Sequence, residues 1–290
     1  MVLWTVNGCA DSGSCHAHIV LAVAGGQQTL SSSALIGSLE FYDVWSDLWR
    51  TAHPMPLPTA GMGLCTIGQK VYAAAGTDFA GARDVVEEYD PVADCWQRHM
   101  CMHQTMARCR LCPWEKSAAV ACDGMAAELL DVRTRDCVAL PGLLCRRCWM
   151  VGLVATPDSV LYALGGDRSA PMERLNLRMP RAWEQCCIEG ADHVGSCSAA
   201  LCDGGIVVYP HEGRHAWEWL LSSEKMTPGP DLPKPPSNSF LGAAVANSDV
   251  FLLLSGVSSM ELHRLFASDC SWVTCRPPSL QRTMFGIAVV

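Results

Sequence analysis

The stretch VEEYDPVADCW, residues 86–96, places four carboxylates, one thiol and two aromatic rings within eleven residues. Out of context it could be a catalytic acid/base cluster, a cation site or a redox centre. However, LEFYDVWSDLW at residues 39–49 repeats the pattern at a constant offset of 47 residues, with Glu, Tyr, Asp, Asp and Trp in matching places. Repetition at a fixed period is typical of architectures built from stacked structural units. We therefore interpret the stretch as part of a repeated scaffold.

Four weaker copies of this pattern follow along the chain. They contain AELLD from residue 127, ERLNL from residue 173, WEWLL from residue 217 and ELHRL from residue 261. The glutamates of the six copies recur at intervals of 41 to 47 residues: Glu40, Glu87, Glu128, Glu173, Glu218 and Glu261. Tryptophan recurs after most copies, as Trp49, Trp96, Trp183 and Trp272. Copies three, five and six are degenerate, and copy three has Cys137 in the tryptophan place.

A hydrophobic run ending in small residues precedes each copy, as in IVLAVAGG at residues 19–26. The glycines that end these runs are Gly25, Gly26, Gly76, Gly165, Gly166 and Gly256. Most runs follow another apolar run and a two-residue turn such as Gly68-Gln69, which is typical of a β-hairpin. We therefore predict about four short strands in each period, which is the number of strands in one propeller blade. Nothing follows the similar run at residues 284–290, so we expect it to complete the first blade and close the ring.

These residues resemble the kelch repeat. In that pattern, a strand closed by Gly-Gly is followed by Glu-x-Tyr-Asp, a tryptophan, and then Met-Pro and Arg before the next strand. The first copy matches it with Gly25-Gly26, Tyr42-Asp43, Trp49 and Met55-Pro56, and the second with Gly76, Tyr89-Asp90, Trp96, Met102 and Arg108. The resemblance covers residues 18–290 and implies an all-β, six-bladed propeller of four-stranded blades. Residues 1–17 are expected to form a tail or an extra strand.

Composition narrows the class of protein. The 290 residues carry a formal net charge of -8, which argues against a general nucleic-acid binder, because such proteins present a basic face to phosphates. No apolar run reaches the roughly 18 residues that span a bilayer. The 17 cysteines are odd in number and many lie in strand-like segments, and the start of the chain does not resemble a secretory signal. We expect a reduced, cytoplasmic, monomeric chain with no nucleic-acid or membrane partner.

Two groups of residues have side chains that suit a metal. His99, Cys101 and His103 are followed by Cys109 and Cys112, which are good zinc or copper ligands. The next Cys-x-x-Cys pair is too distant for a zinc ribbon, so we favour unpaired loop cysteines and expect no metal or other cofactor. The motif HEGRH at residues 211–215 matches H-E-x-x-H, which binds zinc when a helix places both histidines on one face. Here it follows a strand and contains a glycine, so we favour a polar loop.

Function is expected to lie in the loops, because the copies differ most there. Arg83, Arg168 and Arg214 fall at comparable places in three copies. By resemblance to kelch substrate receptors, these arginines could read an acidic peptide through bidentate contacts; ordinary surface solubility is the other interpretation. We therefore predict a protein-interaction module. A propeller enzyme or metalloprotein is the alternative, although no catalytic motif such as G-x-S-x-G, a phosphate loop or a dinucleotide fingerprint supports an enzyme.

The same resemblance implies a more specific role. Kelch propellers often serve as the substrate-recognition part of a ubiquitin-ligase adaptor, next to a BTB or F-box region. This sequence shows no such region, so we expect that role to need a partner or a longer isoform.

Overall fold

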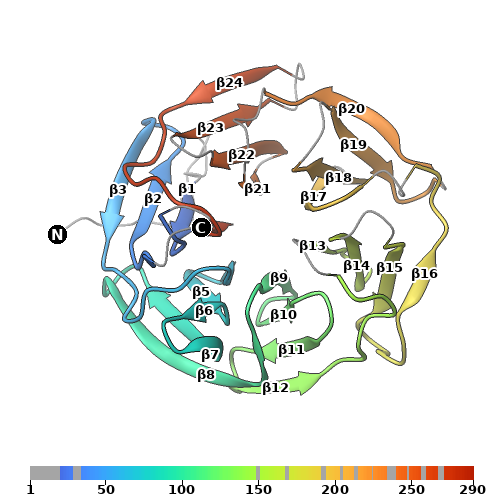
Figure 1. Cartoon of the computed structure of the whole chain (residues 1–290), viewed down its shortest axis with the longest axis horizontal. Helices are drawn as coiled ribbons and strands as arrows, with labels where there is room; N and C mark the ends of the chain where they lie inside the picture. Colours follow the sequence, from blue (N-terminus) through green and yellow to red (C-terminus); the bar gives the residue numbers. More distant parts are fainter. Residues whose placement is uncertain are drawn as a thin grey trace, which may run out of the picture.

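The computed structural model shows six antiparallel β-sheets arranged in a ring around a central axis (Figure 1). The sheets follow one another along the chain and are numbered here as blades 1 to 6. The structure describes residues 20–28, 34–147, 151–166, 170–190, 194–202, 205–211, 215–223, 225–233, 240–246, 248–255, 259–266 and 271–290. Within these ranges no helix is long and apolar enough to cross a membrane. The all-β, six-bladed propeller predicted from the repeats is confirmed.

The first three blades contain these strands, given from the axis outward. Blade 1 consists of β25 (Gly286–Val289), β1 (Val20–Ala24), β2 (Leu39–Asp43) and β3 (Leu48–Ala52). Blade 2 consists of β4 (Gly63–Ile67), β5 (Lys70–Ala74), β7 (Gly81–Asp90) and β8 (Cys95–Met106), with the short β6 (Thr77–Asp78) paired to β7. Blade 3 consists of β9 (Arg110–Trp114), β10 (Ala118–Cys122), β11 (Ala127–Asp131) and β12 (Asp136–Ala139).

The other three blades follow the same order. Blade 4 consists of β13 (Val151–Ala155), β14 (Val160–Gly165), β15 (Met172–Asn176) and β16 (Glu184–Cys186). Blade 5 consists of β17 (Cys197–Cys202), β18 (Gly205–Pro210), β19 (His215–Leu220) and β20 (Thr227–Asp231). Blade 6 consists of β21 (Phe240–Ala246), β22 (Asp249–Ser255), β23 (Met260–Leu265) and β24 (Trp272–Cys275).

The C-terminal strand completes blade 1. β25 pairs antiparallel with β1, from Leu21 opposite Val289 to Ala24 opposite Gly286. It therefore takes the innermost place that β4, β9, β13, β17 and β21 hold in the other blades. Because this pairing covers the inner edge of β1, the first blade does not present an open strand there. The closure predicted from residues 284–290 is confirmed.

The repeated Tyr, Asp and Trp residues join blades 1 and 2 each to the blade before it. The Tyr89 hydroxyl donates to Asp94 Oδ1 (2.6 Å), and Asp94 also accepts the backbone N–H of His53 (2.9 Å), just after blade 1. These two hydrogen bonds, chiefly that of Tyr89, lower the pKa of Asp94. The Trp96 indole donates to the His53 carbonyl (2.9 Å). Residues 86–96 therefore form the joint between blades 1 and 2.

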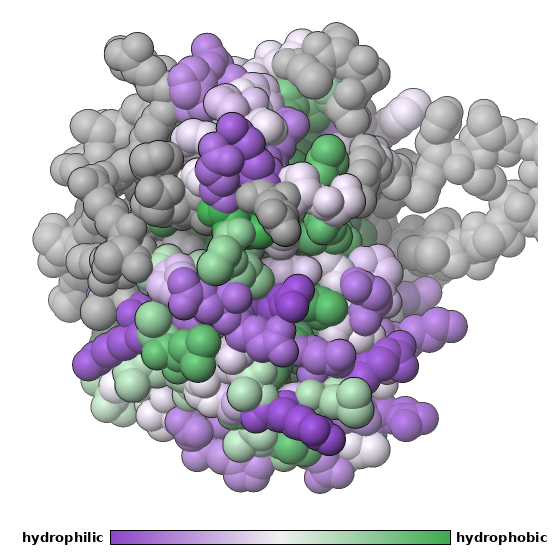
Figure 2. Space-filling model, turned by 90° about the vertical axis from the view of Figure 1, so that its right-hand side faces the viewer, coloured by the Kyte–Doolittle hydropathy of each residue, from purple (hydrophilic) through white to green (hydrophobic). Residues whose placement is uncertain are grey.

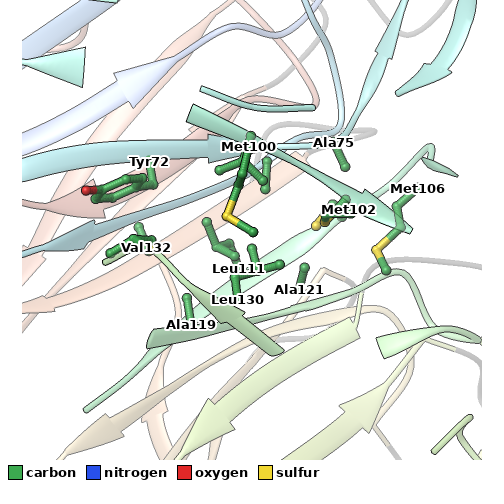
Figure 3. Packing of buried hydrophobic residues seen from close by; sticks show 14 of the residues in the cluster. Tyr72, Ala75, Met100, Met102, Met106, Leu111, Ala119, Ala121, Leu130 and Val132 are labelled. Carbon is green, nitrogen blue, oxygen red and sulfur yellow. The ribbon is translucent and has the colours of Figure 1, made fainter. Parts of the chain in front are cut away.

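Apolar layers between neighbouring blades make up the core. Met100, Met102 and Met106 lie along β8 and pack against Leu111 and Leu130 of blade 3 (Figure 3). Methionine is unbranched and flexible, so it fills the irregular space between two twisted sheets. Similar buried clusters lie between every other pair of adjacent blades. The core is thus a ring of layers and not one central mass.

Gly76, two residues after β5, lies where a side chain would not fit. Its φ is +86°, and a Cβ atom there would lie 2.6 Å from Thr59 Cγ2 and 2.8 Å from the Ala60 carbonyl oxygen. We expect Gly76→Ala to lower the free energy of unfolding by at least ~2 kcal/mol, because it adds overpacking to backbone strain. Gly68→Ala, with φ +65° and open space around the added atom, should cost only about 1 kcal/mol. Urea unfolding compares the two variants, and equal losses would contradict the steric argument.

Candidate functional site

The repeated glutamate is buried in blades 1 to 4, and in blades 1, 3 and 4 it anchors the segment that leads into its own blade. In blade 4, Glu173 accepts backbone hydrogen bonds from Leu144 (2.7 Å) and Cys145 (3.2 Å), which lie in the connection from blade 3. The Arg147 guanidinium donates to the same carboxylate (2.9 Å) and to the Gly165 carbonyl (2.5 Å). Both charged side chains are fully buried, so each depends on the other for charge compensation.

Blade 1 repeats this arrangement across the closure of the ring. Glu40 accepts the backbone N–H of Ser279 (3.2 Å) and forms a buried ion pair with Arg282. Both partners lie in the connection that follows blade 6, so the contact joins the two ends of the propeller. Burial lowers the pKa of Arg282, while the nearby Glu40 carboxylate opposes this effect. The buried glutamate therefore fixes the segment that precedes β25.

The sequence suggested Arg83 as a partner-binding residue. It lies in β7, and its side chain contacts other residues of the propeller. It is 7% exposed, and its guanidinium donates to Thr59 Oγ1 (2.7 Å). It also forms ion pairs with Glu87 (3.3 Å) and Asp78 (3.5 Å). The positive charge beside the buried glutamate thus comes from within blade 2. Arg83 is therefore part of the blade and not an open loop arginine. Its burial and its pairing with Glu87 were not visible in the sequence.

Glu218 and Glu261 depart from the pattern of burial. Glu218 in β19 is exposed, whereas its neighbour Trp219 is buried and its ring contacts Tyr162 of blade 4 edge-on. Glu261 in β23 is partly exposed and lies 3.0 Å from His263. The repeat thus carries a glutamate in all six copies, but only the first four place it in the buried position. Three residues singled out from the sequence, Arg168, Arg214 and Gly256, lie outside the described residues.

One end of the ring exposes several large apolar side chains. This end, called the loop face here, carries the loops between the second and third strands of each blade and the connections between blades. Phe79, at the tip of the β6–β7 hairpin, is 76% exposed. Among the residues that the structure describes, the other large exposed apolar side chains of the loop face are Leu57, Met125, Leu144 and Leu280. On the outer edge of the ring, hydrophilic and hydrophobic residues are interspersed (Figure 2).

The axial channel is too small for an ordinary substrate. Its cavity has a volume of about 100 Å³ and is lined by the innermost strands of all six blades. Small-molecule sites usually occupy roughly 300–1,000 Å³. The geometry therefore favours a function carried by the surface of the propeller and not by its centre.

Comparisons with known proteins agree with the repeats and the fold. A family model described as Kelch motif matches residues 58–102, from the connection before blade 2 into β8. Kelch-like protein 4 of Homo sapiens is 31% identical over 68 residues, which are 23% of this chain and 10% of that protein. The motif match, the similarity to Kelch-like protein 4 and the six-bladed ring together support a kelch-repeat family for this chain. Kelch propellers generally mediate protein–protein interactions and are not enzymes as a rule. The match spans about a tenth of the length of Kelch-like protein 4.

The kelch propeller buries the cysteines that the sequence placed in a loop. Cys109 packs in the layer between blades 2 and 3, whereas Cys112, in β9, packs between blades 3 and 4. The two thiols face opposite sides because neighbouring positions along a strand alternate between its faces. Burial raises the pKa of each thiol to about 12. Cys109 lies in the connection between β8 and β9, as expected, but it is buried, whereas the loop position was wrong for Cys112. This Cys-x-x-Cys pair therefore does not form one site.

The H-E-x-x-H match in the kelch propeller falls between two strands. His211 follows β18, and His215 is the first residue of β19, where its exposed ring pairs with Asp231. Residues 212–214 lie outside the described residues. A zincin needs a helix to place both imidazoles on one face, and the two described histidines are not on one.

Glu88 is the polar residue of the 86–96 stretch that the repeat does not explain. It is buried, accepts a hydrogen bond from the Tyr72 hydroxyl (2.8 Å) and pairs with Lys70. Although burial opposes it, these hydrogen bonds hold the pKa of Glu88 below its usual range. His99 Nδ1 lies 3.1 Å from Glu88, and His99 Nε2 lies 2.7 Å from the Val132 carbonyl of blade 3. This network joins blades 2 and 3 of the kelch propeller, and its only signal in the sequence is that Glu88 has no acidic counterpart in the first copy.

Proposed function

We propose that this kelch propeller is an interaction module that binds a protein or peptide partner through its loop face. The observation that carries the proposal is the exposure of Phe79 together with Leu57, Met125, Leu144 and Leu280 on one end of a rigid ring. These side chains are distributed around the loop face, and Phe79 is the largest and most exposed of them. A few large side chains contribute most of the binding energy in many interfaces.

The charged part of the proposal rests on Arg168 and Arg214. In the sequence they fall between β14 and β15 and between β18 and β19, which are second-to-third-strand connections like the one that carries Phe79. Guanidinium groups bind carboxylates in a bidentate manner. A partner with apolar anchor residues beside acidic ones would suit this combination. Arg83 would contribute indirectly, by fixing β7 through Glu87 and Asp78.

The finer proposal is that the propeller is the substrate-recognition part of a ubiquitin-ligase adaptor. It rests on the resemblance to kelch substrate receptors, and it needs a BTB or F-box region from a partner chain or a longer isoform. A reduced, cytoplasmic setting belongs to the same proposal. The cysteines among the described residues form no disulfide, which suits such a setting.

Affinity purification with quantitative mass spectrometry tests the loop face. We expect the proteins recovered with the wild-type chain to fall at least about tenfold with Phe79→Asp, because a charge in the contact removes a residue worth roughly 2 kcal/mol or more. Arg168→Glu and Arg214→Glu should weaken recovery of the same proteins.

Val92→Asp is the matched control. Val92 is 82% exposed in the turn between β7 and β8, on the opposite end of the same blade. It should leave recovery unchanged. If Val92→Asp lowers the recovery of these proteins and Phe79→Asp does not, the binding site lies on the other end of the ring. If no protein is recovered in a way that depends on either variant, the interaction proposal fails.

A further inference from the structure

Blade 3 lacks the arginine that accompanies the buried glutamate in blades 1, 2 and 4. Glu128 has 0% of its side chain exposed and accepts the backbone N–H of His103 (2.9 Å). Three residues after the corresponding amide donor, blades 1 and 4 have Arg282 and Arg147, whereas blade 3 has Met106. Met106 is part of the apolar layer between blades 2 and 3 (Figure 3). The buried carboxylate therefore lies in a position where the other blades place a guanidinium, and another cation can take that place.

Cys137 is the second departure of blade 3 from the repeat. It stands where other copies have tryptophan, and its Sγ lies 3.4 Å from the Cys101 carbonyl, as the Trp96 indole lies beside the His53 carbonyl. A thiol is much smaller than an indole. The His103 ring lies in the adjacent space, with its Nδ1 3.2 Å from Cys137 Sγ.

The strands bring three different donor atoms together. Glu128 in β11 is opposite Ala139 and Leu130 is opposite Cys137, so Glu128 and Cys137 are diagonal neighbours on one face of blade 3. His103 comes from β8 of blade 2, where the pairing with β7 is irregular between residues 101 and 106. This irregularity allows the strand to turn His103 toward blade 3. His103 Nδ1 lies 3.3 Å from Glu128 Oε2, and one donor atom from each residue lies within 4.8 Å of the other two.

We propose that His103, Glu128 and Cys137 bind a zinc ion between blades 2 and 3. Imidazole nitrogen, carboxylate oxygen and thiolate sulfur are the ligands that Zn²⁺ takes, whereas Ca²⁺ and Mg²⁺ take oxygen. Ligand atoms about 2.0–2.3 Å from one tetrahedral zinc lie roughly 3–4 Å apart, which matches the separations of 3.2 and 3.3 Å.

The site has an opening and one position left for another ligand. The His103 side chain is 60% exposed, so an ion can enter from solvent. On binding, the Cys137 thiol releases its proton to solvent and becomes a thiolate ligand. Glu128 can keep its backbone hydrogen bonds, because each carboxylate oxygen has a second lone pair. Three protein ligands leave a fourth position for water or for a group from a partner.

Cobalt titration of the purified, chelator-treated chain tests the site. Co²⁺ replaces Zn²⁺ in such sites and gives a near-ultraviolet thiolate charge-transfer band. We expect this band to appear with one equivalent of Co²⁺, to disappear when Zn²⁺ is added, and to be absent in Cys137→Ser. Zinc affinity should fall by at least roughly tenfold in Cys137→Ser and in His103→Ala.

Cys101→Ser is the control, since Cys101 is an exposed thiol on the same strand but outside the cluster. It should bind Co²⁺ as the wild type does. Thermal unfolding gives a second measurement: Zn²⁺ should raise the Tm of the wild type and of Cys101→Ser, but not that of Cys137→Ser. A band that persists in Cys137→Ser, or no band in the wild type, would overturn the proposal. A loss of folded structure in Cys137→Ser would be seen by circular dichroism, and His103→Ala then decides the question, with wild-type affinity counting against the site.

Discussion

Deletion of residues 286–290 should abolish the folded state under conditions in which the full chain is folded. The deletion removes β25, the innermost strand of blade 1, and leaves β1 with an unpaired inner edge. It also uncovers Leu21 and Val23, which are buried against blade 6. The deletion should therefore lower the free energy of unfolding by more than the roughly 5–15 kcal/mol that keeps a typical domain folded. Size-exclusion chromatography and tryptophan fluorescence should show an unfolded or aggregated chain.

A control chain keeps the deleted residues but moves them to the other end of the propeller. The N–H of Val290 donates to the Val20 carbonyl (2.7 Å), so the end of β25 lies beside the start of β1. Moving residues 284–290 in front of Val20 through a two-residue turn, such as the Gly68-Gln69 turn of blade 2, should restore the ring. Normal unfolding of the deleted chain would contradict the closure. If the rearranged chain also fails to fold, the covalent connection between residues 283 and 284 is itself needed for folding.

Arg147→Met should lower the free energy of unfolding by about 3–5 kcal/mol, the usual cost of leaving one partner of a buried ion pair uncompensated. Arg147 and Glu173 both have 0% of their side chains exposed, at a separation of 2.9 Å. The variant removes the guanidinium but keeps an unbranched side chain. The decrease in the free energy of unfolding therefore measures the contribution of the charge and its hydrogen bonds. Urea unfolding monitored by circular dichroism measures it.

Arg174→Met is the matched control in the same blade. Arg174 pairs with Glu184 at the same distance of 2.9 Å, but their side chains are 52% and 66% exposed. Exposed pairs contribute about 0–1 kcal/mol, because water screens the charges in both states. A similar loss in both variants would mean that burial does not set the strength of these contacts.

The repeats made the fold predictable because each copy carries its own local signals. Tyr89, Asp94 and Trp96 recur with their spacing as Tyr42, Asp47 and Trp49, and both sets make the same contacts with the preceding blade. The two-residue turns were likewise readable, since most strand pairing within a blade involves neighbours in the sequence. The run at residues 284–290 was readable because it resembles the runs that open other periods.

The contacts between blades were not predictable in the same way. Arg83 appeared to be a loop arginine, whereas it lies in β7, is buried, and contacts both Glu87 of its own strand and Thr59 of the preceding connection. Cys109 and Cys112 appeared to be one pair, although they pack on opposite sides of blade 3. Cys137 appeared to be a decayed tryptophan position, and only the fold brings it to His103. For the three cysteines the deciding neighbours are distant in sequence, and the repeat pattern carries no information about them.

The position of β25 also has a consequence for biosynthesis. As the last strand of the propeller to leave the ribosome, it must find β1, which was made first. Until then, blade 1 has an exposed strand edge and blade 6 has an uncovered apolar face, both of which favour aggregation. The long separation between Leu21 and Val289 also makes this pairing entropically slow. Nascent chains of this propeller should therefore depend on chaperones until the final strand is complete.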